Sequence, residues 1–266
     1  MVKKLAVIGK DVSKSISPQI HAFIAKRLNI DISYDKISIP EDEFESRIDG
    51  IIQAYDGVNV TIPYKIVIKS HLEKVVGDGK IFGAVNTVLC GNLTGDNTDG
   101  LGFMLMLVNN GVNVAKKKAL VLGAGGAGRS VVKKLTDAGA EVYVYDKNFS
   151  NSCALGKEFG VSALCDIKSD DYFLIVNATG VGMHKTEGLS PVDEEVLSRC
   201  EVAVDLIYVP EKSAFLKIAE SLGKKIINGK AMLFYQAYYA DCIFFGLKPD
   251  VGQAKTLFTQ FLSEGL

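Results

Sequence analysis

Two short predicted strands are each followed by an ionisable side chain. Lys65 follows the apolar run Val58–Ile62, about one turn into the helix that we expect next, and Asp99 lies in the polar segment Gly95–Gly100. At neighbouring strand ends these residues can pair, which would hold and orient the ammonium group. Taken alone, Lys65 is also compatible with a solvated surface lysine, and Asp99 with a helix cap. The pair therefore predicts a site only if other polar groups join it.

Hydroxyl and amide side chains occupy further positions where predicted strands pass into loops or helices. They are Ser15, Ser17, Asn59, Thr61 and Asn86. Ligands of open α/β sheets bind at such strand ends. Ser17 is also a candidate helix N-cap, because a proline follows it, whereas Ser15 has no such structural role. Asn86 lies within an otherwise apolar strand, where a polar residue usually has a specific partner. Together these groups could hydrogen-bond a polyhydroxylated acid without a metal ion.

A glycine-rich turn follows a later strand and opens a helix. Gly123, Gly125 and Gly128 match the pattern G-x-G-x-x-G, and Asp146 ends the next predicted strand. Bare backbone allows a pyrophosphate to approach closely, and the helix N-terminus supplies free N–H groups. A purely structural turn is the alternative. A P-loop is excluded, because Arg129 follows where a lysine and a hydroxyl residue would be needed. The pattern predicts a dinucleotide site.

The elements that must position these residues alternate between short strands and helices along the whole chain. This alternation predicts an α/β protein built around mainly parallel sheets. Gly91–Asn92 predicts a two-residue hairpin turn, so one antiparallel strand is expected in the first sheet. We place a substrate domain at residues 1–101, completed by C-terminal helices at 230–266, and a Rossmann-type dinucleotide domain at 102–229.

Composition excludes several other classes of protein. The 266 residues carry a formal net charge of −1, which gives no general attraction to nucleic acid or anionic lipid. The most apolar long segment, Ala231–Gly246, is too short to span a bilayer and predicts a buried helix. The five cysteines are scattered and the three histidines show no ligand spacing, so we expect no metal, a reducing cytoplasm, and histidines on the surface or in the packing.

The chain resembles the shikimate dehydrogenase family, whose members reduce 3-dehydroshikimate to shikimate with NADP as the usual cofactor. The resemblance runs nearly end to end and rests on segments in the family's order and spacing: SISPQIH, GVNVTIPYK, GAVNTV, GDNTDG, GAGGAGR, VNATGVGM, DLIYVP and NGKAMLFYQA. It implies two α/β domains, one catalytic and one of Rossmann type, and an oxidoreductase that binds a small-molecule substrate. The oligomeric state is left open between monomer and homodimer.

The resemblance also implies a role for individual residues. Lys65 and Asp99 would form the catalytic pair, with Lys65 as general acid, or as base in the reverse direction. Substrate contacts would come from Ser15, Ser17, Thr61, Asn86, Tyr208 and Gln236. Cofactor contacts would come from Gly123, Ala124, Gly125, Gly126, Ala127, Gly128, Asp146, Lys147, Asn148, Thr179, Leu206 and Gly229.

The strand end at Asp146 departs from the family pattern. Asp146, Lys147 and Asn148 stand where the family has an Asn-Arg-Thr type motif that grips the 2′-phosphate of NADP. An aspartate there can accept hydrogen bonds from both ribose hydroxyls of NAD and repels the phosphate of NADP. Lys147 acts in the opposite sense, because an ammonium can pair with a phosphate. We therefore expect both cofactors to work, with NAD used better than is typical of the family. Lys10 and Lys14 depart as well and add positive charge near the serines.

Two other functions compete with this interpretation. A quinate or quinate/shikimate dehydrogenase is a sister activity, and Ser17 weighs mildly against it because dedicated quinate enzymes often carry threonine there. A non-catalytic dinucleotide sensor would be expected to lack the Lys65–Asp99 pair or to carry a DNA-binding segment. Neither feature is visible in the sequence.

Overall fold

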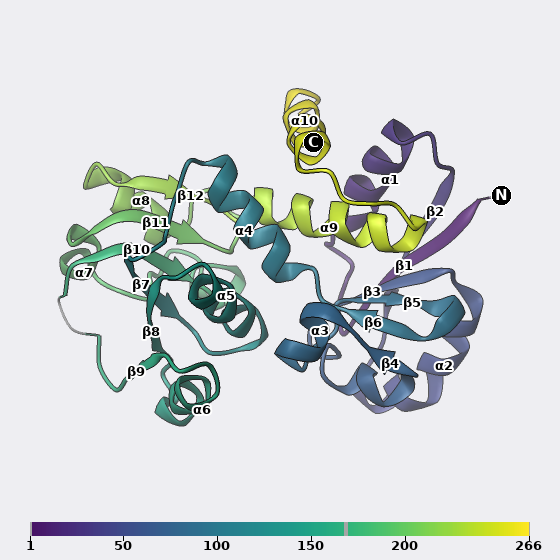
Figure 1. The fold of residues 1–266 in the computed structure, drawn as a ribbon, viewed down its shortest axis with the longest axis horizontal. Helices are drawn as coiled ribbons and strands as arrows, with labels where there is room; N and C mark the ends of the chain where they lie inside the picture. Colours follow the sequence, from purple (N-terminus) through teal and green to yellow (C-terminus); the bar gives the residue numbers. More distant parts are fainter. Residues whose placement is uncertain (1, 168–169, 266) are drawn as a thin grey trace. The chain divides into compact units, whose positions relative to one another are not determined.

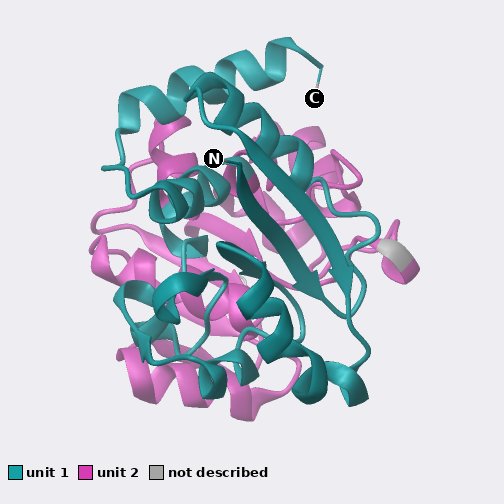
Figure 2. Ribbon diagram, turned by 90° about the vertical axis from the view of Figure 1, so that its right-hand side faces the viewer, with its two compact units in different colours: residues 1–102, 234–266 teal, residues 103–233 magenta. Residues whose placement is uncertain are grey.

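The computed structural model describes residues 2–167 and 170–265. The chain divides into two compact units, which are coloured separately in Figure 2. Unit 1 comprises Met1–Gly102 and Phe234–Leu266, and unit 2 comprises Phe103–Leu233. Helices α4 (Asp99–Asn109) and α9 (Lys230–Phe245) each contain a unit boundary. The boundaries predicted from sequence fall after residues 101 and 229, and the two compact units divide after Gly102 and Leu233.

Unit 1 contains a six-stranded sheet with the order β2-β1-β3-β5-β6-β4 (Figure 1). Its strands are β1 (Lys3–Gly9), β2 (Ile32–Ser38), β3 (Gly57–Val60), β4 (Lys74–Val75), β5 (Thr87–Leu89) and β6 (Thr94–Asp96). Strand β5 runs antiparallel to both of its neighbours, whereas the other pairings are parallel. The prediction of a mainly parallel sheet with one antiparallel addition is confirmed.

Helices of unit 1 pack on this sheet through regularly spaced apolar residues. In α2 (Phe44–Ala54), Phe44, Ile48 and Ile52 recur every fourth residue and all three are buried in the core, as expected for an amphipathic helix. The remaining helical segments are α1 (Ser17–Arg27), η1 (Glu41–Glu43), η2 (Val67–His71), α3 (Gly77–Phe82), η3 (Cys90–Asn92) and α10 (Val251–Ser263).

The prediction of a helix directly after Pro63 is wrong. Residues 62–66 form a turn, and a 3₁₀ segment, η2, begins only at Val67. The backbone explains the difference: the carbonyl of Lys65 accepts a hydrogen bond from the N–H of Val85, at 2.7 Å. In a regular helix that carbonyl would accept the N–H of Lys69, but the Lys69 N–H bonds to the Ile66 carbonyl instead, at 3.4 Å. Lys65 is therefore held in a turn that is tied to the segment just before β5.

The predicted antiparallel pairing of β5 with β6 exists, but the prediction that a two-residue turn at Gly91–Asn92 connects them is wrong. The connection between β5 and β6 is η3 followed by Leu93, whose φ of 48° is left-handed. The N–H of Cys90 still bonds to the carbonyl of Asp56, at 3.0 Å, in continuation of the β3–β5 register, so the chain turns only after Cys90.

Unit 2 contains a second six-stranded sheet, in which every pairing is parallel. Its strands are β7 (Lys118–Leu122), β8 (Glu141–Tyr145), β9 (Ser162–Leu164), β10 (Tyr172–Asn177), β11 (Cys200–Asp205) and β12 (Lys225–Ile227). Their order is β9-β8-β7-β10-β11-β12, which is the 3-2-1-4-5-6 arrangement of doubly wound dinucleotide-binding folds. The predicted Rossmann-type architecture is confirmed.

Side chains cap several helices of unit 2. Asn148, Asp193 and Ser213 are the N-caps of α6 (Phe149–Phe159), α7 (Glu194–Ser198) and α8 (Ala214–Ser221). The other helical segments are α5 (Gly126–Asp137) and η4 (His184–Thr186). The strand order reverses between the neighbours β7 and β10, so the loops that follow these two strands lie at the switch point where such folds bind ligands.

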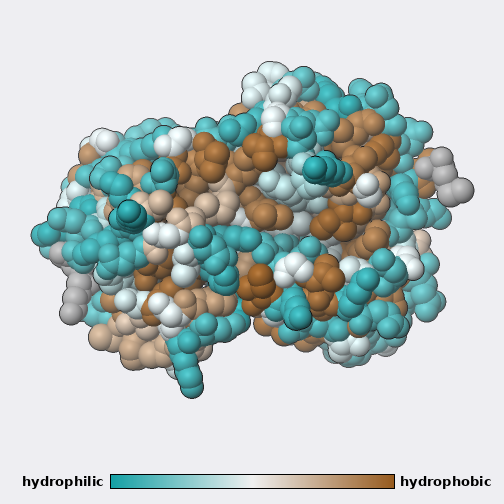
Figure 3. Space-filling model, viewed as in Figure 1, coloured by the Kyte–Doolittle hydropathy of each residue, from teal (hydrophilic) through white to brown (hydrophobic). Residues whose placement is uncertain are grey.

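Within the described part of the chain, no helix has the length and apolar character needed to cross a bilayer. The face drawn in Figure 3 carries hydrophobic residues scattered among hydrophilic ones. Such a mixture is ordinary, because apolar atoms supply more than half of the accessible surface of folded proteins.

Candidate active site

The first feature of the site is an ion pair between Lys65 and Asp99. Lys65 Nζ lies 2.6 Å from Asp99 Oδ2, and the two side chains are 21% and 11% exposed. Lys65 comes from the turn after β3, and Asp99 is the first residue of α4. The lysine is thus held rather than solvated, and the aspartate faces it. Because both groups are largely withdrawn from water, losing either partner leaves a costly unpaired charge.

Asn86 holds the other oxygen of Asp99. Its amide nitrogen lies 2.8 Å from Asp99 Oδ1. The amide orientation is fixed independently, because the backbone N–H of Thr98, which can only donate, bonds to Asn86 Oδ1 at 2.9 Å. Asn86 itself lies one residue before β5 and not inside a strand, which corrects the prediction, but it does have the specific partners that a buried amide requires.

Gln236 reaches the same cluster from helix α9. Its Oε1 lies 3.2 Å from the amide nitrogen of Asn86 and 3.4 Å from the hydroxyl of Thr98. The two hydrogens of the Asn86 amide are thereby shared among acceptors on Asp99, Thr98 and Gln236. A residue 150 positions away in the chain thus joins the site.

The two serines lie together at the start of α1. Ser15 Oγ is 3.0 Å from Ser17 Oγ and accepts the backbone N–H of Ser17 at 3.2 Å. Ser17 is therefore not the N-cap: Ile16 occupies that position and Ser17 is the first helical residue. Ser17, the candidate N-cap, thus has no capping role, whereas Ser15, for which no structural role was expected, accepts a backbone N–H at the start of the helix. Thr61 follows β3, and its carbonyl closes the Lys65 turn by accepting the N–H of Tyr64.

The glycine-rich loop of unit 2 leaves room for a ligand. A methyl group on Gly128 would lie 1.9 Å from the carbonyl oxygen of Gly123, so this position requires glycine for close packing. By contrast, a methyl group on Gly125 or Gly126 would meet nothing within 4 Å. Helix α5 begins at Gly126, so the first backbone N–H groups of this helix lie beside that open space. This geometry fits a pyrophosphate group.

Asp146 closes the other side of that loop. Its Oδ2 accepts the N–H of Ala124 at 2.8 Å, and its Oδ1 accepts the N–H of Asn148 at 2.9 Å and the amide of Asn151 at 3.3 Å. Burial alone would raise the pKa of Asp146, but these donors together with the charge of Lys147 lower it below its usual value. Asp146 is therefore an ionised carboxylate with three of its roughly four acceptor positions in use.

The remaining sequence-predicted residues of unit 2 follow strands β10, β11 and β12. Thr179 lies against Gly123, where a methyl group on the glycine would come within 3.0 Å of Thr179 Cγ2. Gly229 packs on Leu206 so closely that a methyl group would lie 2.1 Å from the Leu206 carbonyl. Tyr208 lies two residues after Leu206, and burial raises the pKa of its phenol. Its substrate role stays a prediction.

Sequence reasoning missed the partners that orient the site. Thr98 and Asn97 belong to the polar segment Gly95–Gly100, and Asn97 Oδ1 accepts the N–H of Asp99 at 3.0 Å. Their position between a strand and a helix was the available signal. His21 is fully buried and lies 2.6 Å from Asp241 Oδ1, a pairing that nothing in the sequence indicates.

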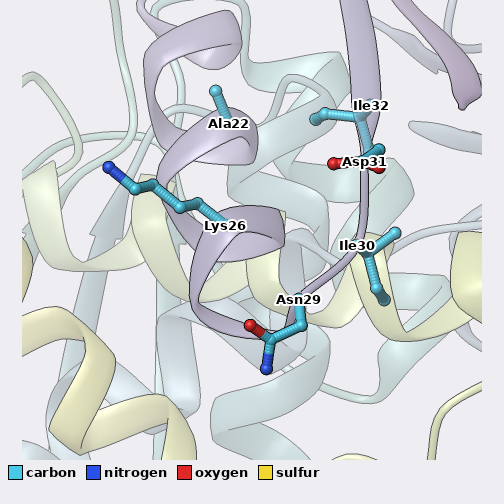
Figure 4. Close-up of a pocket in the computed structure, with 6 residues that line it drawn as sticks. All are labelled: Ala22, Lys26, Asn29, Ile30, Asp31 and Ile32. Carbon is cyan, nitrogen blue, oxygen red and sulfur yellow. The ribbon is translucent and has the colours of Figure 1, made fainter.

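A surface pocket of about 400 Å³ lies at the end of α1 and is lined by Ala22, Lys26, Asn29, Ile30, Asp31 and Ile32, which Figure 4 labels. This lining includes no residue that the sequence predicts for the site. Among the described residues, no group of three or more His, Cys, Asp or Glu side chains is placed to hold a metal ion.

The fold, the Lys65–Asp99 network of unit 1 and the glycine-rich loop of unit 2 together indicate a class of protein, a two-unit α/β oxidoreductase with a Rossmann-type unit. Comparisons with known proteins identify the family within that class. Residues 7–88 match the model of the shikimate dehydrogenase substrate binding domain. The shikimate dehydrogenase (NADP(+)) of Thermus thermophilus is 39% identical over 249 residues, covering 93% of this chain and 94% of its own length. That of Carboxydothermus hydrogenoformans is 37% identical over 263 residues and 94% of each chain.

A solved structure agrees with the sequence relatives. The shikimate 5-dehydrogenase of Thermus thermophilus, crystallised with NADP(H) and shikimate, superposes with a TM-score of 0.88 at 38% identity, covering 98% of this chain and 99% of that one. The chain belongs to the shikimate dehydrogenase family.

Proposed function

We propose that this protein catalyses the reversible reduction of 3-dehydroshikimate to shikimate, with unit 1 binding the substrate and unit 2 the dinucleotide. One observation carries the proposal: a member of this family holds Lys65 against Asp99, with Asn86 fixing the second carboxylate oxygen. A steady-state assay with 3-dehydroshikimate and NADPH tests it directly. Absence of turnover in a folded protein would contradict it.

The chemistry needs a hydride on the ketone carbon and a proton on the ketone oxygen. A reduced nicotinamide dinucleotide supplies the hydride when bound. Lys65, as an ammonium, stabilises the charge that develops on the oxygen and then gives it a proton. In the direction of shikimate oxidation, the neutral amine of Lys65 takes that proton. Asp99 keeps the lysine head in place through the 2.6 Å contact.

The other polar residues of unit 1 are proposed to bind the substrate. Ser15 and Ser17 would hydrogen-bond its carboxylate, and Thr61, Asn86 and Gln236 its hydroxyls. The hydrogen bonds described above support this assignment of two sets of substrate contacts. The serines form one pair, and the amides of Asn86 and Gln236 belong to the Lys65–Asp99 cluster. We also propose that Tyr208 adds a phenol from unit 2.

The serine assignment predicts a selective effect on substrate binding. Ser17→Ala should raise the Michaelis constant for shikimate by about tenfold, which corresponds to about 1.4 kcal/mol, and leave that for the dinucleotide nearly unchanged. Steady-state kinetics with each substrate varied in turn measures both constants. Ser13→Ala is the matched control, since Ser13 bonds to Asp11 and not to Ser15 or Ser17. Equal changes in both Michaelis constants would contradict the assignment.

Quinate distinguishes the sister activity. It carries an extra ring hydroxyl and a tetrahedral carbon beside the carboxylate, so a site shaped for the flatter acid should use it at least about tenfold less efficiently. Quinate turnover with equal or better kcat/KM would replace the shikimate assignment with the quinate/shikimate one.

Both nicotinamide cofactors are proposed to work. The relatives named above are described as NADP-dependent or were solved with NADP(H), and Lys147 is exposed beside the strand end where a 2′-phosphate would need a cation. Asp146 favours NAD, because its carboxylate is ionised and has about one acceptor position left for a ribose hydroxyl. We therefore propose one ribose contact from Asp146 rather than two. Like charges about 4 Å apart repel by roughly 4 kcal/mol at an effective dielectric near 20, and less in salt.

Asp146→Asn should shift the ratio of specificity constants toward NADP by at least about tenfold. The substitution removes the negative charge that opposes the 2′-phosphate, so kcat/KM for NADPH should gain relative to that for NADH. The ratio is the informative measurement, because any disturbance of the Ala124 contact affects both cofactors alike.

Asp137→Asn is the matched control, since Asp137 ends α5 at the opposite end from the glycine loop and pairs with Lys133. This control should leave the ratio unchanged. A wild-type enzyme that strongly prefers NADP, with the same ratio in Asp146→Asn, would show that Asp146 does not act on the ribose.

Cellular context and assembly are proposals as well. All five cysteines are unpaired, which is consistent with a reducing cytoplasm. We propose a cytoplasmic enzyme that works as a monomer or a homodimer.

A further inference from the structure

Tyr34 of strand β2 lies between the serine pair and the polar end of strand β3. Its hydroxyl is 2.7 Å from Asn59 Oδ1. Its ring stacks on His21, which lies one helical turn after Ser17 on α1, and Ser17 is close enough to the phenol to counteract part of the rise in its pKa. Asn59 in turn lies 3.3 Å from the Asn86 carbonyl and 3.4 Å from the Thr87 hydroxyl. Tyr34 therefore joins two elements that carry candidate site residues, the start of α1 and β3.

The direction of each hydrogen bond in this chain can be worked out. The Asn86 carbonyl can only accept, so the Asn59 atom that faces it is the amide nitrogen, and Asn59 Oδ1 faces Tyr34. Tyr34 must then donate to Asn59. Its oxygen is left to accept. Ser15 donates to Ser17, so the Ser17 hydroxyl keeps its own proton to donate toward the neighbouring phenol. The phenol thus has a donor role toward Asn59 and an acceptor role toward Ser17.

The Tyr34 ring is itself held firmly. It stacks on the imidazole of His21, with centroids 4.5 Å apart and planes at 19°. His21 is fully buried and fixed by Asp241, which is also fully buried. Burial and the nearby charge of Asp241 raise the pKa of Tyr34 well above its usual value. The phenol therefore remains a protonated donor throughout the working pH range.

The influence of Tyr34 ends before the catalytic pair. Asn86, which holds Asp99, is oriented by the N–H of Thr98 whatever Asn59 does. Loss of the phenol therefore disturbs Ser17 and Asn59 and leaves the Lys65–Asp99 geometry in place. The contacts of Tyr34 can therefore be removed without disturbing the Lys65–Asp99 pair, so their effect on substrate binding can be measured separately from the catalytic step.

We propose that Tyr34 is a positioning residue for the carboxylate end of the substrate, acting by holding Ser17 and Asn59 in place. The inference rests on the proposed function, since it assigns Ser17 to the substrate carboxylate. A bare hydroxyl at the start of α1 would otherwise have to be ordered when the substrate binds, and that ordering weakens binding. A rigid, stacked ring that holds the Ser17 hydroxyl in advance avoids this ordering when the substrate binds.

Tyr34→Phe tests the proposal, because it keeps the ring on His21 and removes only the hydroxyl. The Michaelis constant for shikimate should rise by about tenfold, kcat should stay within about threefold, and the Michaelis constant for the dinucleotide should not move. Tyr55→Phe is the matched control: its hydroxyl bonds to Asp35, the neighbour of Tyr34 on β2, at 2.8 Å. That control should match the wild type in all three constants.

A double-mutant cycle with Ser17→Ala tests the route. If Tyr34 acts through Ser17, the double variant should show a Michaelis constant for shikimate at least about threefold below the product of the two single effects. Simple multiplication of the effects would overturn the link. An unchanged Michaelis constant in Tyr34→Phe, or a fall in kcat as large as the fall in kcat/KM, would overturn the positioning role. An inactive wild-type enzyme would instead contradict the proposed function itself, and this inference with it.

Discussion

Lys65→Ala is expected to lower kcat for 3-dehydroshikimate reduction by about 10²- to 10⁴-fold, the range that general acid–base groups contribute. The loss includes the proton donor and the ammonium that stabilises the developing alkoxide. The Michaelis constant for the substrate should change much less, because the proposed substrate contacts come from other residues. Stopped-flow or steady-state kinetics with saturating cofactor measures the change.

Two further variants separate the causes. Lys65→Arg keeps a positive charge but cannot give up its proton in the working pH range, so it should be nearly as slow as Lys65→Ala if proton transfer dominates. Lys80→Ala removes an exposed lysine from α3 and should behave as the wild type. The backbone contact that fixes the turn, from Val85 to the Lys65 carbonyl, survives all these changes. Near-normal kcat in a folded Lys65→Ala protein would exclude the role.

The fold of unit 2 could be predicted from the sequence because its signals are local. The strand, glycine turn, helix and second strand from Lys118 to Tyr145 occupy one short stretch, and each piece is specified by residues within it. The positions of glycine are also dictated locally, as the 1.9 Å approach at Gly128 shows. Local consistency of this kind is what single-sequence reasoning can detect.

The surroundings of Lys65 could not be predicted in the same way. Pro63 and the residues after it have an ordinary helix-start pattern, yet the turn is decided by Val85, which takes the Lys65 carbonyl. There a backbone hydrogen bond between segments outweighs a local preference. At the start of α1 the error is local: the Ser17 N–H bonds to the side chain of Ser15, two residues earlier, and the pattern Ser-Pro does not reveal that contact.

The partners furthest apart in sequence were the least accessible. His21 and Asp241 are 220 residues apart, and Tyr34 and Asn59 are 25 apart. Asn59 was marked by its place near a strand end, but nothing local indicates the partner of any of these four, because a buried polar group can be interpreted only together with the group that satisfies it. The sequence identifies the residues with chemical roles, whereas the structure identifies the residues that hold them.

Asp99→Asn is expected to lower kcat by about 10²-fold or more, although the side chain keeps its size. In the wild type, one carboxylate oxygen accepts from Lys65 and the other from Asn86. An amide offers one acceptor and one donor, so one of its ends must place an NH₂ group against a donor. The N–H of Thr98 prevents Asn86 from turning over to relieve this conflict. In either orientation Lys65 loses its charged partner, and the contacts that hold its head weaken. Far-ultraviolet circular dichroism should show the fold unchanged.

The double variant Lys65→Ala/Asp99→Asn shows whether the two residues act as one unit. Asp99 is proposed to act only through Lys65, so once the lysine is gone the aspartate has nothing left to orient, and the double variant should be no slower than Lys65→Ala alone. Groups that work together show such strong non-additivity, whereas independent contributions multiply. A double variant slower by the full product of the two single effects would mean that Asp99 contacts the substrate independently of the lysine. The 2.6 Å contact would then be a consequence of their shared location and not the basis of the mechanism.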